Sequence, residues 1–237
     1  MSRPAPLQRA AQLLELLART YPDAHCELEH SNPLELLMAT ILSAQCTDAR
    51  VNQVTRRLFA RCRTAEDYAT ISQTELETLI QSTGFFRAKA RHLRECAAVL
   101  LERHHGEVPS SLEALTQLPG VGRKTANVVL GDAFGAPEGV VVDTHVQRLA
   151  RRLGLSKHST PEKIEPDLMR LVPKDQWARL SHWLIWHGRR RCEARNPDCA
   201  HCELATLCPS AGNNASRIGR KTPPKKRPRK KPSAPPE

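Results

Sequence analysis

A succession of helical patterns constrains the fold of this 237-residue chain more than any other feature. Residues 6–18 repeat apolar side chains at three- and four-residue spacing, which is typical of an amphipathic helix. Asn32, Pro33 and Glu35 give residues 32–45 an N-cap, a proline at the first helical position and a capping box. The same criteria predict helices over residues 72–84, 85–105, 110–118, 123–134, 144–153, 161–172 and 175–187, with capping boxes at Ser72 and Ser110. The strand-like run at residues 139–143 is too short and isolated to found a sheet, so we predict an all-α fold.

Composition narrows the class of protein. The chain is 40% hydrophobic and long enough for one large domain or two small ones. No apolar run approaches the roughly 20 residues that span a membrane, and the N-terminus lacks the pattern of a secretory signal. We therefore expect an intracellular protein, cytoplasmic or associated with the nucleoid, without membrane contact or disulfides.

Charge is concentrated at the C-terminal end. Residues 216–237 hold nine Lys or Arg and one Glu, and so carry +8 of the formal net charge of +11. This proline-rich segment, within residues 213–237, is predicted to be a disordered basic tail. It is either a region that attracts nucleic-acid phosphates, with a nuclear address as a further possibility, or a solubilising extension.

Four cysteines upstream of that tail form a metal-ligand set. Cys192, Cys199, Cys202 and Cys208 follow the spacing C-x6-C-x2-C-x5-C. Structural zinc usually draws on paired C-x2-C units, and this set has one such unit, so the unequal spacing slightly favours an iron-sulfur cluster while zinc stays open. The remaining cysteines lie in helical contexts and are predicted to be buried small hydrophobic residues: Cys26, Cys46, Cys62 and Cys96.

The segment LPGVGRKTANVV, residues 118–129, joins two short predicted helices. Gly120 and Gly122 allow a tight turn, and N–H groups at the start of the second helix are suited to binding a phosphate. Lys124 lies at the helix end that disfavours a cation, and partial burial there would favour the neutral, nucleophilic amine. The alternative is that Lys124 is a second phosphate contact beside Arg123.

The segment VDTH, residues 142–145, begins another predicted helix. Asp143 is suited to be its N-cap, and a carboxylate facing Lys124 could also stabilise positive charge on a sugar or accept a proton. His145 either orients a phosphate or satisfies a hydrogen bond in the core. Lysine with aspartate suggests attack of an amine on a sugar carbon.

The tryptophans all lie on the helix predicted over residues 175–187. Their helical spacing favours core packing over base stacking: Trp177, Trp183 and Trp186.

These motifs together resemble the helix-hairpin-helix DNA glycosylases, and among them the endonuclease III family. LPGVGRKTA, VDTH and the four-cysteine set occur in the order that the family has, and the resemblance covers residues 7–209. It implies two all-α domains: a six-helix barrel at residues 26–137, with the hairpin at residues 110–134, and a cluster domain that combines residues 1–25 with residues 138–212. DNA would lie between the domains with the damaged nucleotide flipped out. We expect a monomer acting on damaged double-stranded DNA.

The resemblance also implies roles for individual residues. Lys124 would attack C1′ of the flipped nucleoside, and the resulting Schiff base would permit β-elimination, with Asp143 assisting. The four cysteines would hold a 4Fe-4S cluster. The implied DNA contacts are Gln45, which would fill the gap left by the flipped base, Phe85, Gly120, Gly122, Arg123 and His145. Asp48 would be a structural partner.

One position departs from the family pattern. In TGFFRAKA, residues 83–90, Phe85 stands where the family usually has an aliphatic side chain that wedges into the duplex. It is either an aromatic wedge or a residue packed in the barrel.

The function implied is a bifunctional glycosylase and abasic-site lyase of base excision repair, acting on oxidised pyrimidines. An adenine or mismatch glycosylase is the nearest rival, and Lys124 argues against it. A noncatalytic DNA-binding or redox-sensing iron-sulfur protein is the rival from another class.

Overall fold

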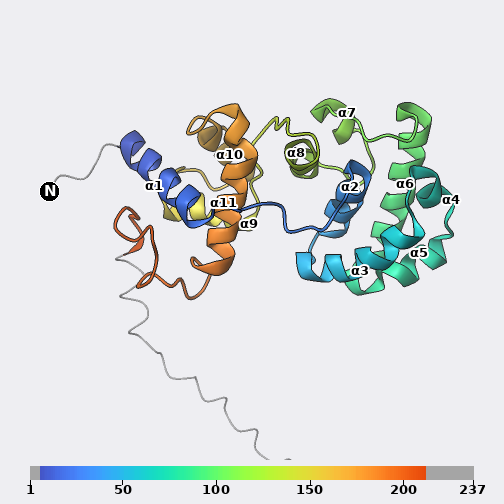
Figure 1. Cartoon of the computed structure of the whole chain (residues 1–237), viewed down its shortest axis with the longest axis horizontal. Coiled ribbons are helices and arrows are strands. Elements are labelled where there is room, and N and C mark those ends of the chain that lie inside the picture. The colour runs from blue at the N-terminus through green and yellow to red at the C-terminus, as the bar shows by residue number, and fades with distance from the viewer. Residues whose placement is uncertain (1–5, 212–237) are drawn as a thin grey trace, which may run out of the picture.

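The computed structural model describes residues 6–211, and these residues fold into helices arranged in two lobes (Figure 1). No strand forms within that range. The α-helices are α1 (Pro6–Thr20), α2 (Pro33–Leu42), α3 (Asp48–Arg61), α4 (Ala65–Thr70), α5 (Gln73–Ile80), α6 (Phe86–His104), α7 (Leu112–Thr116), α8 (Arg123–Asp132), α9 (Thr144–Arg152), α10 (Pro161–Met169) and α11 (Trp177–Arg190). Short 3₁₀ turns cover Gln81–Thr83 and Lys174–Gln176. The predicted all-α fold is therefore confirmed for the described residues.

The first lobe holds α2 to α8 around one apolar core. Its buried side chains include Leu36, Leu58, Leu93 and Leu130, which come from four different helices. The α8 helix packs on α2 and α7 within this lobe and also meets α11 of the other lobe. Because α8 begins with the glycine-rich turn, this packing fixes the position of Lys124 relative to both lobes.

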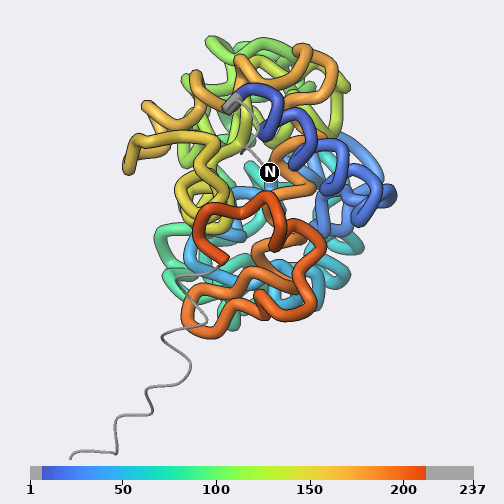
Figure 2. Tube along the Cα trace, turned by 90° about the vertical axis from the view of Figure 1, so that its left-hand side faces the viewer, coloured from blue at the N-terminus to red at the C-terminus, as the bar shows by residue number. Residues whose placement is uncertain are grey.

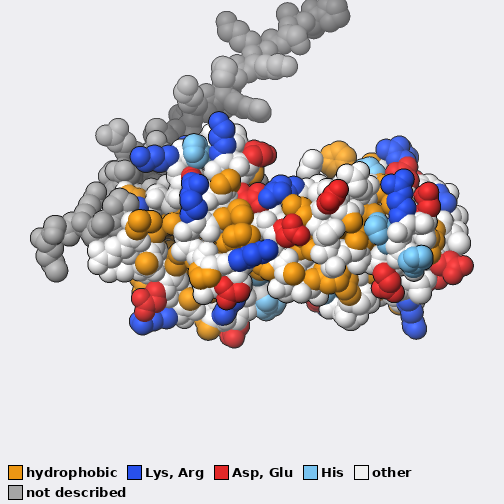
Figure 3. All heavy atoms as spheres, turned by 90° about the horizontal axis from the view of Figure 1, so that it is seen from above, with side chains coloured by type: hydrophobic (Ala, Val, Ile, Leu, Met, Phe, Trp, Pro, Cys, Tyr) orange, Lys and Arg blue, Asp and Glu red, His pale blue; other side chains and the backbone are white. Residues whose placement is uncertain are grey.

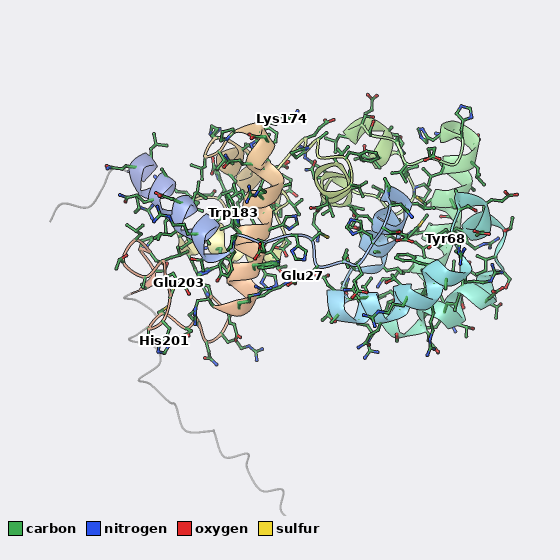
Figure 4. All side chains as sticks on the ribbon, viewed as in Figure 1. Glu27, Tyr68, Lys174, Trp183, His201 and Glu203 are labelled. Carbon is green, nitrogen blue, oxygen red and sulfur yellow. The ribbon has the colours of Figure 1, made fainter. Side chains whose placement is uncertain are left out.

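The second lobe joins the start of the chain to its later part. The α1 helix packs against α11, and α11 packs against α9, so segments far apart in sequence share one core. Figure 2 shows the loops after α11 lying beside α1. The tryptophan prediction is confirmed, since Trp183 and Trp186 are buried in this core and Trp177 is partly buried against it. Figure 4 places Trp183 within this lobe.

Local details differ from the predicted pattern in three places. The cap of α7 is Ser111, which accepts a hydrogen bond from the Ala114 N–H, and not Ser110. Glu35 accepts from the backbone N–H of Ser31 instead of closing the predicted box on Asn32. The prediction does not include α3 and α4. The α3 sequence carries many charged residues and has no acid at the third helical position to complete a capping box. The α4 helix is only six residues long, and its capping box uses Thr64 and Asp67.

The strand-like run at residues 139–143 is instead a largely buried connection from α8 to α9 without regular secondary structure. Its Val141 N–H donates to Ser181 Oγ at 2.9 Å, so a side chain of α11 takes the place of a strand partner. Across the described helices, none is both long and apolar enough to cross a bilayer. Acidic, basic and apolar side chains are interspersed over the face seen in Figure 3. The basic tail predicted at residues 213–237 lies outside the described residues.

Candidate active site

Lys124 and Asp143 line the same recess between the lobes. Both border a cavity of about 90 Å³ and a wider adjoining groove of about 1080 Å³. Lys124 lies in the first turn of α8, whose core contacts belong to the first lobe, whereas Asp143 precedes α9 of the second lobe. The tertiary structure thus brings the predicted amine and carboxylate to one site.

The two residues sit at helix starts of different kinds. Asp143 is the N-cap of α9 and accepts from the Val146 N–H at 2.8 Å, so the capping prediction is confirmed. The N-cap of α8 is Gly122, which offers no side chain, so its first N–H groups receive no side-chain cap. Lys124 is exposed in this structure, so the condition of partial burial is not met.

The turn before α8 requires glycine at one of its two positions. Gly120 has φ +77°, and a Cβ built there would lie 3.0 Å from the Cβ of His92. Gly122 has an extended φ of −92°, and a Cβ there would meet no atom within 4 Å. Gly120 is therefore explained by the turn itself, while the open space at Gly122 leaves room for another molecule to approach the start of α8.

Arg123 has a partner that the sequence analysis did not identify. Its guanidinium forms a bidentate ion pair with Glu165 of α10, with both N···O distances 3.0 Å. Asn127, one turn along α8, donates to the same carboxylate at 3.2 Å. Glu165 packs so closely on Gly139 that a side chain there would collide with its carboxylate. The start of α8 is thereby tied to the second lobe.

Further polar links cross between the lobes. Arg189 of α11 forms ion pairs with Glu27 and, at 2.6 Å, with Asp48 at the start of α3. Figure 4 places Glu27 between the lobes. His182 of α11 contacts Asp132 at the end of α8 at 2.6 Å, with both side chains mostly buried. The structural role expected for Asp48 is thus its ion pair with Arg189.

Gln45 and Phe85 share an uncommon backbone conformation. Their φ values are +53° and +47°, in the left-handed region that side chains other than glycine seldom adopt. Gln45 lines the wide groove together with Lys124. Phe85 is 68% exposed, so the alternative in which it packs inside the barrel is wrong. Its neighbour Phe86 is the ring that packs partly against the core.

His145 lines the wide groove and is held in place by its own helix. Its Nδ1 lies 3.1 Å from an Arg148 nitrogen, and its ring packs against Gly188 of α11. Arg148 also donates to the carbonyl of Gly188 at 2.8 Å. The hydrogen bond predicted as one alternative is present, and the position on the groove keeps the phosphate alternative open.

The four clustered cysteines line one common cavity at the far end of the second lobe. Each is a partly buried free thiol, and burial raises the pKa of the Cys202 thiol to about 11. Arg152 Nη1 lies 3.3 Å from the Cys192 sulfur, and His187 Nε2 lies 3.6 Å from the Cys202 sulfur. Burial lowers the pKa of His187 to about 4, so its ring is neutral. These nitrogens can donate to sulfur, as is suited to thiolate ligands.

The arrangement of the four cysteines indicates whether a single metal ion or a cluster would fit between them. Among the described residues, no three His, Cys, Asp or Glu side chains are grouped closely enough to hold a single metal ion. The four cysteines nevertheless line one cavity, as a multi-iron cluster held by four cysteines would require. The dispersed cysteines behave as predicted at Cys62 and Cys96, which are buried. Cys26 and Cys46 are only partly buried, and Cys46 lines the wide groove.

Two charged residues that join the lobes, Glu165 and Arg189, were not assigned from the sequence. Glu165 shares a helix face with the core residue Leu168, three positions on, and an acid on an apolar face is a sign of a buried partner. Arg189 gave no comparable sign, because its partners lie more than 140 positions away.

Comparison with known proteins gives concordant matches. The family model "HhH-GPD superfamily base excision DNA repair protein" matches residues 38–174. Endonuclease III of Synechocystis sp. is 53% identical over 204 residues, which cover 86% of this chain and 93% of that protein. Endonuclease III of Escherichia coli K12 is 41% identical, covering 84% and 95%. A solved non-covalent endonuclease III–DNA complex aligns with a TM-score of 0.86 at 45% identity, covering 90% and 100%.

Proposed function

Because the chain belongs to the HhH-GPD superfamily of base excision DNA repair proteins and is a DNA glycosylase, we propose that it is a bifunctional enzyme. It removes oxidised pyrimidines from duplex DNA and then nicks the strand. The observation that carries this proposal is the meeting of Lys124 and Asp143, from different lobes, at one cavity and groove. A monofunctional glycosylase needs no amine nucleophile at that position.

The proposed reaction begins at the Lys124 amine. Its lone pair forms a bond to C1′ of the flipped nucleoside while the glycosidic C1′–N bond breaks and the base departs with that electron pair. The Asp143 carboxylate stabilises positive charge on the sugar as the bond breaks, and it accepts a proton from the attacking amine. The exposure of Lys124 supports direct access of the sugar to its nitrogen.

The second stage cleaves the strand. Opening of the sugar ring gives an imine between Lys124 and C1′. Loss of a proton from C2′ then drives elimination of the 3′ phosphate, so that the C3′–O bond breaks and the strand is nicked. Both stages use the same nitrogen, which is why one substitution is expected to abolish both.

We propose DNA contacts at the residues around the groove. Gln45 fills the space of the flipped base, and Phe85 enters the duplex, which is supported by its exposed ring. Gly120, Gly122 and the first N–H groups of α8 bind a phosphate, as uncapped helix starts do. His145 adds a further phosphate contact at the groove. For Arg123, the ion pair with Glu165 supports a role in joining the lobes instead.

We also propose that Cys192, Cys199, Cys202 and Cys208 hold a 4Fe-4S cluster. When bound, the cluster supplies a covalent crosslink among loops that have little secondary structure of their own. The two hydrophobic cores support domain boundaries at residues 25/26 and 137/138. The boundary at 212/213 lies outside the described residues and stays a prediction. The expected monomer stays a prediction.

The test is borohydride trapping on a duplex with a single thymine glycol. The wild-type protein is expected to form a covalent adduct, whereas Lys124→Gln and an undamaged duplex are expected to give none. Lys124→Gln should still bind lesion DNA within a few-fold of wild type. Base release without an adduct would replace the proposal with a monofunctional glycosylase, and binding without base release would leave a noncatalytic protein.

A further inference from the structure

A buried lysine in the first lobe has no part in the proposed chemistry. Lys89 lies in the first turn of α6 and is 4% exposed. Its ammonium donates to the carbonyl of Leu42 and to the carbonyl of Thr83, each at 2.8 Å. Burial lowers the pKa of Lys89. A buried cation held by carbonyl oxygens is costly for a fold, so its presence calls for a reason beyond packing.

The two carbonyls belong to the segments that carry Gln45 and Phe85. Leu42 is the last residue of α2 and precedes the loop to Gln45, while Thr83 ends the turn just before Phe85. Segments about 40 positions apart in sequence are thus bonded to one nitrogen atom. The positive charge also lies at the C-terminal end of α2, where a cation is favoured by the helix dipole.

Both attached segments hold a strained residue. Gln45 and Phe85 each have a positive φ, which persists only where surrounding contacts enforce it. The α6 helix adds to this restraint, because the Lys89 N–H donates to the Phe85 carbonyl at 3.1 Å. One residue therefore restrains the Phe85 corner through its backbone and joins that corner to the Gln45 loop through its side chain.

We propose that Lys89 is a positioning residue that fixes the Gln45 and Phe85 loops to each other, so that both side chains enter the DNA as one unit. The proposal rests on the proposed function, because it assigns these loops to the opening of the duplex. Lys89 itself touches no DNA. Its effect is on the flipping step and not on the amine chemistry at Lys124.

The test measures flipping apart from chemistry. In a Lys124→Gln background, binding to a thymine glycol duplex with 2-aminopurine beside the lesion should raise the fluorescence as that base loses its stacking partner. Adding Lys89→Met should reduce the rise by ~5-fold or more, while Kd stays within ~3-fold because the phosphate contacts remain. Methionine fills a similar volume without donating to either carbonyl.

A matched variant separates positioning from general loss of stability. Leu100→Ala, in the same Lys124→Gln background, removes a fully buried side chain further along α6 and leaves both carbonyls of the loops bonded. It should lower the melting temperature and keep the fluorescence rise. Should Lys89→Met fail to fold, Lys89→Gln carries the test, since its shorter side chain can donate to one carbonyl but cannot span both.

A double-mutant cycle shows whether Lys89 acts through the loops. Once Gln45→Ala and Phe85→Ala are present, Lys89→Met should change the remaining rise by less than ~2-fold, because the groups it positions are gone. An undiminished rise in Lys89→Met, or a full further loss in the cycle, would overturn the proposal. Failure of wild-type borohydride trapping would instead reject the proposed chemistry, which the fluorescence measurement does not use.

Discussion

Replacing Arg123 by alanine tests whether this residue joins the lobes or contacts DNA. The structure pairs its guanidinium with Glu165, whose side chain is 10% exposed, whereas the Arg123 side chain is 52% exposed. Removing Arg123 leaves a mostly buried carboxylate with one remaining donor, Asn127. We therefore expect the folded state to be destabilised, and the recess between the lobes to lose one of its polar links.

The expected size follows from the burial of the two partners. Breaking a fully buried ion pair costs about 3–5 kcal/mol, because an uncompensated charge stays in the interior. The exposed half of Arg123 and the remaining Asn127 hydrogen bond reduce this cost, since solvent already screens part of the pair. About 2 kcal/mol is therefore expected, which for a chain of this size lowers the melting temperature by roughly 4–8 °C.

The assay combines thermal unfolding with DNA binding over a range of salt concentrations. Arg56→Ala is the matched control, because Arg56 pairs with Glu29 at an exposed site and its loss should change the melting temperature little. Glu165→Gln combined with Arg123→Ala should cost less than the two separate changes added together, since each removes the same interaction.

Two measurements on Arg123→Ala together would refute its role in joining the lobes. If Arg123→Ala left the melting temperature unchanged and lowered the slope of log K against log salt by about 0.9, Arg123 would be a phosphate contact. The assignment of Arg123 to the junction between the lobes would then be wrong, although the ion pair is present in the free protein.

Three further outcomes are expected. Gly139→Ala should lower the melting temperature clearly more than Gly122→Ala. A methyl group at Gly139 would collide with the Glu165 carboxylate, whereas one at Gly122 would meet no atom within 4 Å. Equal losses of melting temperature would contradict this expectation. The Asp67 carboxylate accepts hydrogen bonds from the backbone N–H groups of Arg63 and Thr64, and these lower its pKa. Its contribution to stability at this exposed cap, less than about 1 kcal/mol, should therefore be present above about pH 4 and be lost as the pH falls below that value. Urea unfolding at several pH values should therefore show a smaller pH dependence in Asp67→Asn than in wild type. Truncation after Ala215 should reduce the salt slope of DNA binding by about 0.9 for each phosphate that the tail neutralises, and an unchanged slope would show that the tail does not take part.

Local information in the sequence was sufficient for several features. The all-α class follows from apolar spacing and caps, such as Asn32 before α2 and Asp143 before α9, because these depend on residues a few positions apart. The hairpin turn and the spacing of the clustered cysteines are local in the same sense. Where local signals competed, as at Ser110 and Ser111, the structure has Ser111 as the cap of α7.

Tertiary structure decided which charged groups meet. The sequence marked Arg123 as a cation near a turn, but only folding sets Glu165 of α10 against it. Likewise, nothing near Lys89 in the sequence shows that its ammonium joins the end of α2 to the turn before Phe85. The physical reason is that helix formation responds to neighbours within a turn or two, whereas a buried charge is stabilised by partners that long-range packing brings to it.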